Sequence, residues 1–287
     1  METTGKKTGW LLLCGAALTL CVLLQYLCPQ ILFWGAWLYE KIKLGAADAA
    51  LLQNNVYAWY TGHALWAAAL YHIVGAAAFG FWYKALRRGG AFVPVKQTFR
   101  LQTVCAVLLT GVGLQFLLSC VLQMIYLAAP QLLQGYNQMM ENTGIGDVSA
   151  LSLAVTVIAA PLSEELLCRG VILHCAQKAA GRFWAANLIQ AAAFGLIHMN
   201  WVQGLYAFVL GLVLGAFCHW HGSVFSSIAL HAVINLSGLL LVDAVLGAVP
   251  AKVMWYLPLS LLFAAVCGWG LWLAAGARQP DKTNGPR

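Results

Sequence analysis

Two adjacent glutamates lie in the middle of an apolar stretch of the chain, followed four residues later by an arginine. Ionisable side chains at membrane depth are costly and are candidates for function by default. Neighbouring residues on a helix point about 100° apart, so Glu164 and Glu165 cannot share one role. Glu165 and Arg169 are spaced i,i+4 and form a charge pair, which leaves Glu164 without a local counter-ion. Glu164 is therefore suited to accept a proton, the alternative being that both carboxylates only hold helices together.

Two further polar pairs follow in apolar stretches. His198 comes one helical turn after Phe194, and His231 comes one turn before Asn235 on the same helix face. A single histidine in a membrane helix more often bridges helices than reacts, but three polar elements in succession favour one shared site. The chain has neither HExxH nor GxSxG, the signatures of a zinc protease and of a serine nucleophile. What remains is suited to activating a water and stabilising an oxyanion without a covalent intermediate.

The composition indicates a membrane environment for these residues. Of the 287 residues, 62% are hydrophobic and 9% are charged, against about 25% charged in a soluble domain. The apolar residues fall into runs close to the roughly 20 residues that a membrane-spanning helix needs. The net charge of +7 gathers at the ends of these runs and not on one face, which argues against a nucleic-acid partner. We expect a single membrane domain over residues 1–287, in contact with membrane lipid.

The runs predict an all-α polytopic fold of about eight transmembrane helices around a polar intramembrane cavity. Residues 29–50 carry four charges and are expected to lie partly along the membrane interface. The run at 183–198 is short for a spanning helix. The expected helix cores are 9–27, 56–83, 101–129, 148–173, 183–198, 203–218, 223–245 and 253–275.

The distribution of basic residues predicts that both termini are cytoplasmic, because cytoplasmic loops carry an excess of Lys and Arg. Of the 16 basic residues, only Lys41, Lys43 and Lys252 fall in segments that this topology places outside, and Arg169 lies within a helix. The loop 130–147 has no basic residue. The segments placed inside hold Lys6, Lys7, Lys84, Arg87, Arg88, Lys96, Arg100, Lys178, Arg182, Arg278, Lys282 and Arg287.

The order of the three motifs, EExxxR, then FxxxH, then HxxxN, resembles the CAAX-protease and bacteriocin-processing family of intramembrane proteases, which includes the type II CAAX prenyl endopeptidases. The resemblance covers roughly residues 148–240. It implies an eight-helix membrane fold whose polar cavity opens toward the cytoplasm. By the same resemblance, Glu164 and His198 activate a water and His231 and Asn235 stabilise the oxyanion. The supporting residues are Glu165, Arg169 and Phe194.

The resemblance implies an intramembrane endopeptidase that cuts a membrane-associated substrate, either a CAAX-type C-terminal tail or a peptide precursor. No cofactor is favoured, but Glu164, His198 and His231 also suit a three-ligand zinc site with an open position. The competing interpretation is a non-catalytic membrane protein such as a bacteriocin-immunity factor or a scaffold. A transporter with Glu164 as its proton site comes third, since the sequence has no evident repeat. If the source is bacterial, the plasma membrane is the expected location.

Overall fold

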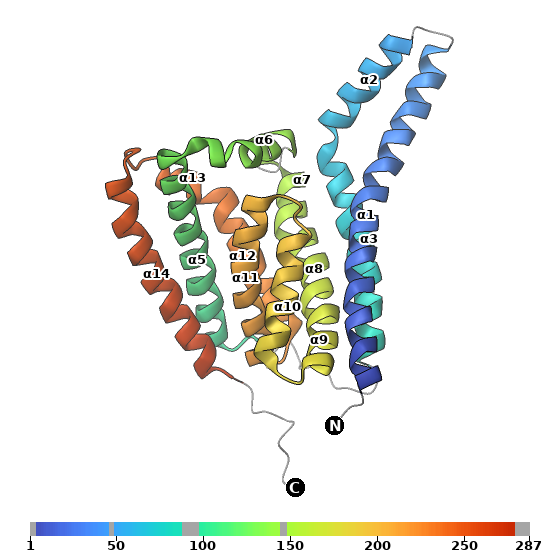
Figure 1. Ribbon diagram of the computed structural model, residues 1–287. Coiled ribbons are helices and arrows are strands. Elements are labelled where there is room, and N and C mark those ends of the chain that lie inside the picture. The colour runs from blue at the N-terminus through green and yellow to red at the C-terminus, as the bar shows by residue number, and fades with distance from the viewer. Residues whose placement is uncertain (1–3, 46–48, 88–97, 144–147, 279–287) are drawn as a thin grey trace.

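The computed structural model describes residues 4–45, 49–87, 98–143 and 148–278, and every element in these ranges is helical (Figure 1). Arg88, Lys96, Lys282 and Arg287, which the topology prediction uses, lie outside the described residues, as does Asp48 in the predicted interfacial stretch. The main helices are α1 (Thr4–Leu44), α2 (Ala49–Gly62), α3 (Ala64–Leu86), α5 (Leu101–Ala128), α6 (Gln134–Thr143), α10 (Phe183–Leu196), α11 (Trp201–His221), α12 (Val224–Leu240), α13 (Val242–Leu246) and α14 (Val253–Gly276).

Between α6 and α10 one continuous helix runs from residue 150 to residue 180, assigned as alternating α and π segments. Within the described residues, six helices are long and apolar enough to cross a membrane, and this continuous helix is one of them. Two shorter apolar helices, α10 and α12, complete the bundle. An all-α membrane fold is therefore observed, whereas the number of crossings, predicted as about eight, stays a prediction.

The bundle is built in two groups around the continuous helix. On one side α5 packs along α14 and also against α12, and on the other α1 and α3 pack against the continuous helix. Helices α10 and α11 form a close antiparallel pair that closes the remaining side. Figure 1 shows α6 lying across one end of this bundle, while α1 begins and α14 ends at the opposite end. We call these the α6 end and the terminal end.

The predicted end of the first helix is wrong. It was expected near residue 27, but α1 continues through Pro29 to Leu44. That residues 29–50 lie partly along the membrane interface stays a prediction. The 41 residues of α1 make it about 61 Å long at 1.5 Å per residue, twice the thickness of a bilayer core. The outer part of α1 pairs with α2, and this hairpin extends beyond the α6 end (Figure 1). An amide–carboxylate bond of 3.1 Å from Asn55 to Glu40 joins the two helices.

Three further segments differ from the prediction. The single run expected at 56–83 is two helices that break at His63, whose φ of −122° and ψ of 20° are not helical. The expected loop 130–147 contains α6, a polar helix that the apolar pattern of the sequence does not predict. The run 223–245 is divided between α12 and α13. Each difference follows from tertiary packing of short or polar helices, which hydrophobic periodicity detects poorly.

The two ends of the bundle differ in charge. Side-chain contacts fix the ends independently of the drawing: Trp10 at the start of α1 packs on His174, and Arg278 beyond α14 lies over Trp220 at the end of α11. The α6 end has three described basic residues, Lys41, Lys43 and Lys252. The described basic residues of the terminal end are Lys6, Lys7, Lys84, Arg87, Arg100, Lys178, Arg182 and Arg278.

Candidate active site

The two glutamates sit on a short α segment between two π segments. Helix α8 (Ala160–Glu165) is preceded by the π segment η2 (Ala154–Ala159) and followed by the π segment η3 (Leu166–Ile172). In η2 the register is i→i+5, since the Ala160 amide donates to the Val155 carbonyl. Wide π turns inside α-helices occur frequently at functional sites, where they redirect side chains. The glutamates therefore lie where the helix departs from regular geometry.

Glu165 is fully enclosed and paired. Its Oε1 accepts a hydrogen bond of 2.8 Å from Nη1 of Arg169, and both side chains are 0% exposed. The i,i+4 spacing predicted this contact. The guanidinium also donates from Nη2 to the Gly211 carbonyl at 3.2 Å, and its Cζ lies 4.5 Å from the centre of the Phe194 ring. A buried arginine is tolerable in a membrane only when it is paired with an acidic side chain and hydrogen-bonded in this way, although its Nε has no hydrogen-bond partner.

Glycines in α11 bring these partners within reach. A Cβ on Gly211 would lie 2.9 Å from the Cα of Ala191, and one on Gly215 would collide with the Asn187 side chain. The small-xxx-small spacing of the two glycines permits this close approach of α11 to α10. Because α10 and α11 are so close, Gln190 also donates to the Gly211 carbonyl at 2.8 Å. That carbonyl thus accepts from both Arg169 and Gln190 and fixes the guanidinium in position.

His231 connects the two glutamates. Its Nδ1 lies 2.9 Å from Oε1 of Glu165, and its Nε2 lies 3.8 Å from Oε2 of Glu164. A carboxylate oxygen accepts, so Nδ1 carries the proton and donates to Glu165. His231 is thereby oriented by the enclosed glutamate and addresses the neighbouring one.

His198 is held in one tautomer by the backbone. Its Nδ1 lies 2.7 Å from the carbonyl of Phe194, which can only accept, so Nδ1 carries the proton and Nε2 is free to accept one. The Phe194 ring meets the rings of His198 and His231 edge-on, with centroids 5.0 and 5.7 Å apart. Phe194 is 1% exposed and lies in contact with both histidines and with Arg169.

Asn235 is bonded to a carbonyl that the continuous helix leaves without a donor. Its Nδ2 donates to the Thr156 carbonyl at 2.8 Å. In the i→i+5 register of η2 that carbonyl would pair with residue 161, but Pro161 has no N–H. One amide hydrogen of Asn235 is thus engaged in satisfying Thr156, and the second remains available. The spacing of His231 and Asn235 predicted a common direction but not this bond.

All four predicted catalytic residues line one cavity of about 510 Å³, a size typical of ligand pockets. They are Glu164, His198, His231 and Asn235. Glu164 differs from Glu165 in that its side chain is 13% exposed. The cavity wall combines these polar groups with apolar side chains from eight helices. The structure thus brings the four residues together, whereas Glu165 and Arg169 lie behind the wall.

A third histidine, which none of the sequence motifs contains, also lines the cavity. His72 of α3 has its Nδ1 2.7 Å from Oγ of Ser163, the residue before Glu164. The Ser163 hydroxyl donates to the Ala160 carbonyl at 3.1 Å, so its oxygen accepts from Nδ1 of His72. The position of Ser163 beside the glutamates was the only sequence signal, and His72 lies 91 residues away.

The three histidines therefore share a pattern, in which Nδ1 is occupied by an acceptor and Nε2 is the nitrogen left for chemistry. Metal-binding histidines often show the same arrangement. Among the described residues, however, no three His, Cys, Asp or Glu side chains are grouped closely enough to hold a metal ion. Glu164, His198 and His231 line one cavity, but their side chains do not form such a group.

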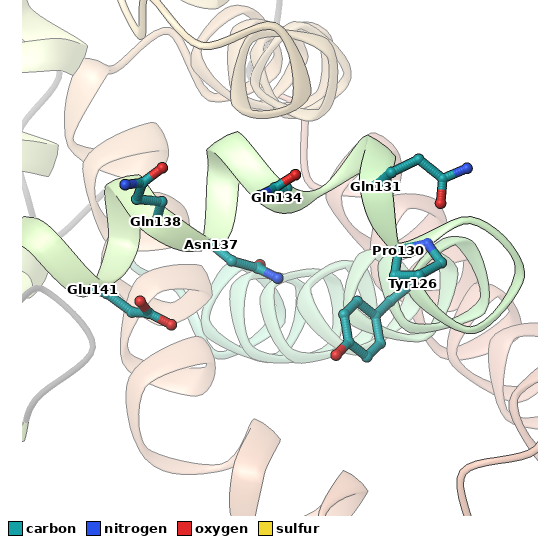
Figure 2. Close-up of a pocket in the computed structure, with 7 residues that line it drawn as sticks. All are labelled: Tyr126, Pro130, Gln131, Gln134, Asn137, Gln138 and Glu141. Carbon is teal, nitrogen blue, oxygen red and sulfur yellow. The ribbon is translucent and has the colours of Figure 1, made fainter.

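A separate hollow of about 510 Å³ lies along the outer face of α6. Figure 2 shows its lining side chains, mostly amides, spread along α6 and the end of α5. None of the catalytic residues lines it. Its residues are Tyr126, Pro130, Gln131, Gln134, Asn137, Gln138 and Glu141.

Comparison with known proteins gives one match. Residues 147–237 match the family model described as Type II CAAX prenyl endopeptidase Rce1-like. No curated protein and no solved structure matches the chain. The matched segment contains EExxxR, FxxxH and HxxxN, together with both π segments and most of α12. The match confirms the predicted resemblance: the motif-bearing segment is similar to the Rce1-like type II CAAX prenyl endopeptidases.

Proposed function

We propose that the chain is an intramembrane endopeptidase that hydrolyses a peptide bond with a water activated by Glu164 and His198. The observation that carries this proposal is the contrast within one cavity. A partly exposed carboxylate, Glu164, faces a space large enough for a peptide, beside a histidine whose Nε2 is held ready to accept a proton. These are the requirements of general-base catalysis.

The reaction begins when the Glu164 carboxylate accepts a proton from the water, whose oxygen attacks the scissile carbonyl carbon. The tetrahedral intermediate carries its negative charge on the former carbonyl oxygen. His231, protonated on Nε2, and the second amide hydrogen of Asn235 donate to that oxygen. The intermediate then collapses, the C–N bond breaks, and Glu164 delivers its proton to the leaving amine. Each proton and electron pair is accounted for without a covalent enzyme intermediate.

Glu165 contributes by keeping His231 oriented. Because Nδ1 of His231 donates to Glu165, the imidazole can act as an oxyanion donor only when Nε2 is protonated. The bond to Glu165 fixes the orientation of the ring, and Arg169, 2.8 Å from the same carboxylate oxygen, holds Glu165 in place. Arg169 is therefore a positioning residue and does not touch the substrate.

The Rce1-like match supports a peptide substrate, either a CAAX-type tail or a peptide precursor. The test is cleavage of fluorogenic peptides of both kinds by the purified chain in lipid nanodiscs, with the Glu164→Gln variant as control. Cleavage by the wild type alone supports the proposal. A folded wild type that cleaves no peptide of either class would favour a non-catalytic membrane protein.

The same preparation separates carboxylate-driven from zinc-dependent hydrolysis. We expect activity to persist after chelation and dialysis, with the metal content measured by elemental analysis of wild type and His231→Ala. Stoichiometric zinc in active wild type, lost in His231→Ala and required for cleavage, would replace Glu164-driven chemistry with a metal mechanism.

A further inference from the structure

The catalytic cavity is displaced toward one end of the molecule. Three of its lining residues, Tyr136, Met139 and Met140, belong to α6, which lies across the α6 end (Figure 1). Asp243 of α13 also lines it, although that side chain is exposed at the same end. No lining residue comes from the last turn of α3 or from α9 (Leu173–Ala180), at the terminal end. The cavity therefore reaches the surface at the α6 end.

Helix directions lead to the same conclusion without reference to the drawing. Helix α11 starts at the α6 end, and its cavity residues, from Gln203 to Leu210, all fall in its first half. Helix α12 starts at the terminal end, and its cavity residues run from His231, near the middle of the helix, to Leu239, near its end. Gln25 of α1 lines the cavity 21 residues after the helix begins. Its side-chain amide donates to the carbonyl of Ile197, directly after the C-terminal end of α10.

The excess of basic residues marks the other end of the molecule. Eight described Lys and Arg residues gather at the terminal end and three at the α6 end. No described acidic residue lies at the terminal end to offset them, whereas Glu40, Glu141 and Asp243 lie toward the α6 end. The positive-inside rule assigns the terminal end to the cytoplasm. The α6 end then faces away from it.

Two expectations from the sequence are therefore incompatible. Cytoplasmic termini and a cavity that opens toward the cytoplasm would require both features at one end, but they lie at opposite ends. The first rests on the charges of this chain. The second was implied only by the family resemblance. We therefore assign the orientation in the membrane from the charge distribution of this chain.

We infer that the catalytic cavity opens on the non-cytoplasmic side of the membrane and receives apolar peptide segments from that side. This inference rests on the proposed peptidase function. The outer part of the cavity supplies the apolar contacts, from Leu122, Met139, Met140, Leu239 and Val242. Flexible methionines on α6 suit a surface that accepts varied apolar side chains. A tail that is presented in the cytoplasm would approach the closed end of the bundle.

Orientation is tested first by cysteine labelling in intact cells. Gln138→Cys places a thiol on the exposed outer face of α6, and Arg182→Cys is its matched control at the exposed terminal end. The nine native cysteines are free, seven of them buried, so the parent chain provides the background. We expect a membrane-impermeant maleimide to label Gln138→Cys in intact cells and Arg182→Cys only after permeabilisation. The reverse pattern, or equal labelling of both, would overturn the inference.

Access is tested next with sealed vesicles and a fluorogenic apolar peptide that is tethered to dextran and cannot cross the membrane. We expect cleavage in right-side-out vesicles and at least ~10-fold less in inverted ones, with Glu164→Gln inactive in both. Cleavage mainly in inverted vesicles, or equally in both, would overturn the inference while leaving the peptidase intact. No cleavage even in detergent would remove the proposed function and the substrate with it, while labelling would still decide the orientation.

Discussion

Glu164 and Glu165 are the same residue type on adjacent positions of one helix, yet their surroundings are opposite. Glu165 is 0% exposed and bonded to Arg169 and His231, whereas Glu164 is 13% exposed and faces the cavity. The 100° between neighbouring residues is enough to place one side chain inside the wall and the other on its surface. One carboxylate is thereby enclosed in the helix packing, and the other lies at the cavity, where we propose that it transfers a proton.

The strongest challenge to this comparison is Glu164→Gln. The amide keeps the shape of the side chain but cannot accept a proton from water, so peptide cleavage should fall by about 10²–10⁴-fold. The free energy of unfolding should stay close to that of wild type, because Glu164 is partly exposed and His231 keeps its 2.9 Å contact with Glu165. The measurements are kcat in nanodiscs and thermal unfolding of the same preparation. Normal cleavage by a folded Glu164→Gln chain would refute the mechanism.

Asn235 requires a pair of variants, since it both satisfies the Thr156 carbonyl and is proposed to donate to the oxyanion. Asn235→Ala should lower kcat by about 10²–10³-fold with little change in KM. Pro161→Ala supplies the missing N–H to Thr156 and should leave activity within a few fold of wild type. The double variant should regain stability but not kcat. If it regains kcat, Asn235 serves only to satisfy Thr156.

Glu165→Gln tests whether the enclosed glutamate stabilises the fold. It leaves Arg169 uncompensated and His231 without its carboxylate, so we expect a loss of about 3–5 kcal/mol in the free energy of unfolding. Activity should fall as well, because His231 loses its orientation. Glu164→Gln, one residue away and with the same change of charge, is the matched control for stability. Equal unfolding free energies for the two variants would show that the enclosed pair has no special structural role.

The smallest expected effect concerns His72. Ser163→Ala removes the acceptor of its Nδ1 proton, and a hydrogen bond of this kind is worth about 0.5–1.5 kcal/mol, or roughly 2–10-fold in kcat. Ser237→Ala is the control, because that buried hydroxyl bonds only the Val233 carbonyl of its own helix and does not line the cavity. A pH–rate profile that shifts for Ser163→Ala and not for Ser237→Ala would support a role of His72 near the reacting atoms. Unchanged profiles for both would limit His72 to packing.

The sequence predicted those parts of the site that depend on position along one helix. The i,i+4 spacing of Glu165 with Arg169 leads directly to the observed bond, and the same spacing puts His231 and Asn235 on one cavity wall. Contacts between distant segments were not predictable in this way. His72 meets Ser163 across 91 residues, and no local pattern encodes which two helices will be neighbours.

The departures from regular helix were also beyond the sequence patterns. Apolar periodicity predicted a helix across residues 148–173 but gave no sign of η2 and η3, because a π turn changes the hydrogen-bond register and not the composition. Pro29 and His63 show the converse. The proline lies inside α1, while the break between α2 and α3 falls at a histidine in an apolar run. Packing decides such positions, not propensity.

The π segment η2 also determines how the chain tolerates a change in length. An i→i+5 turn holds one residue more than an i→i+4 turn, so removing one residue from η2 returns it to α register with both flanks in phase. Deletion of Ile158, which is 65% exposed, should leave Glu164 directed into the cavity and Thr156 still opposite the proline. The same deletion inside α11 would rotate every following residue by about 100° and separate Gly215 from α10. The helix that carries the glutamates can thus lose one residue of η2 without a change in the direction of its other side chains.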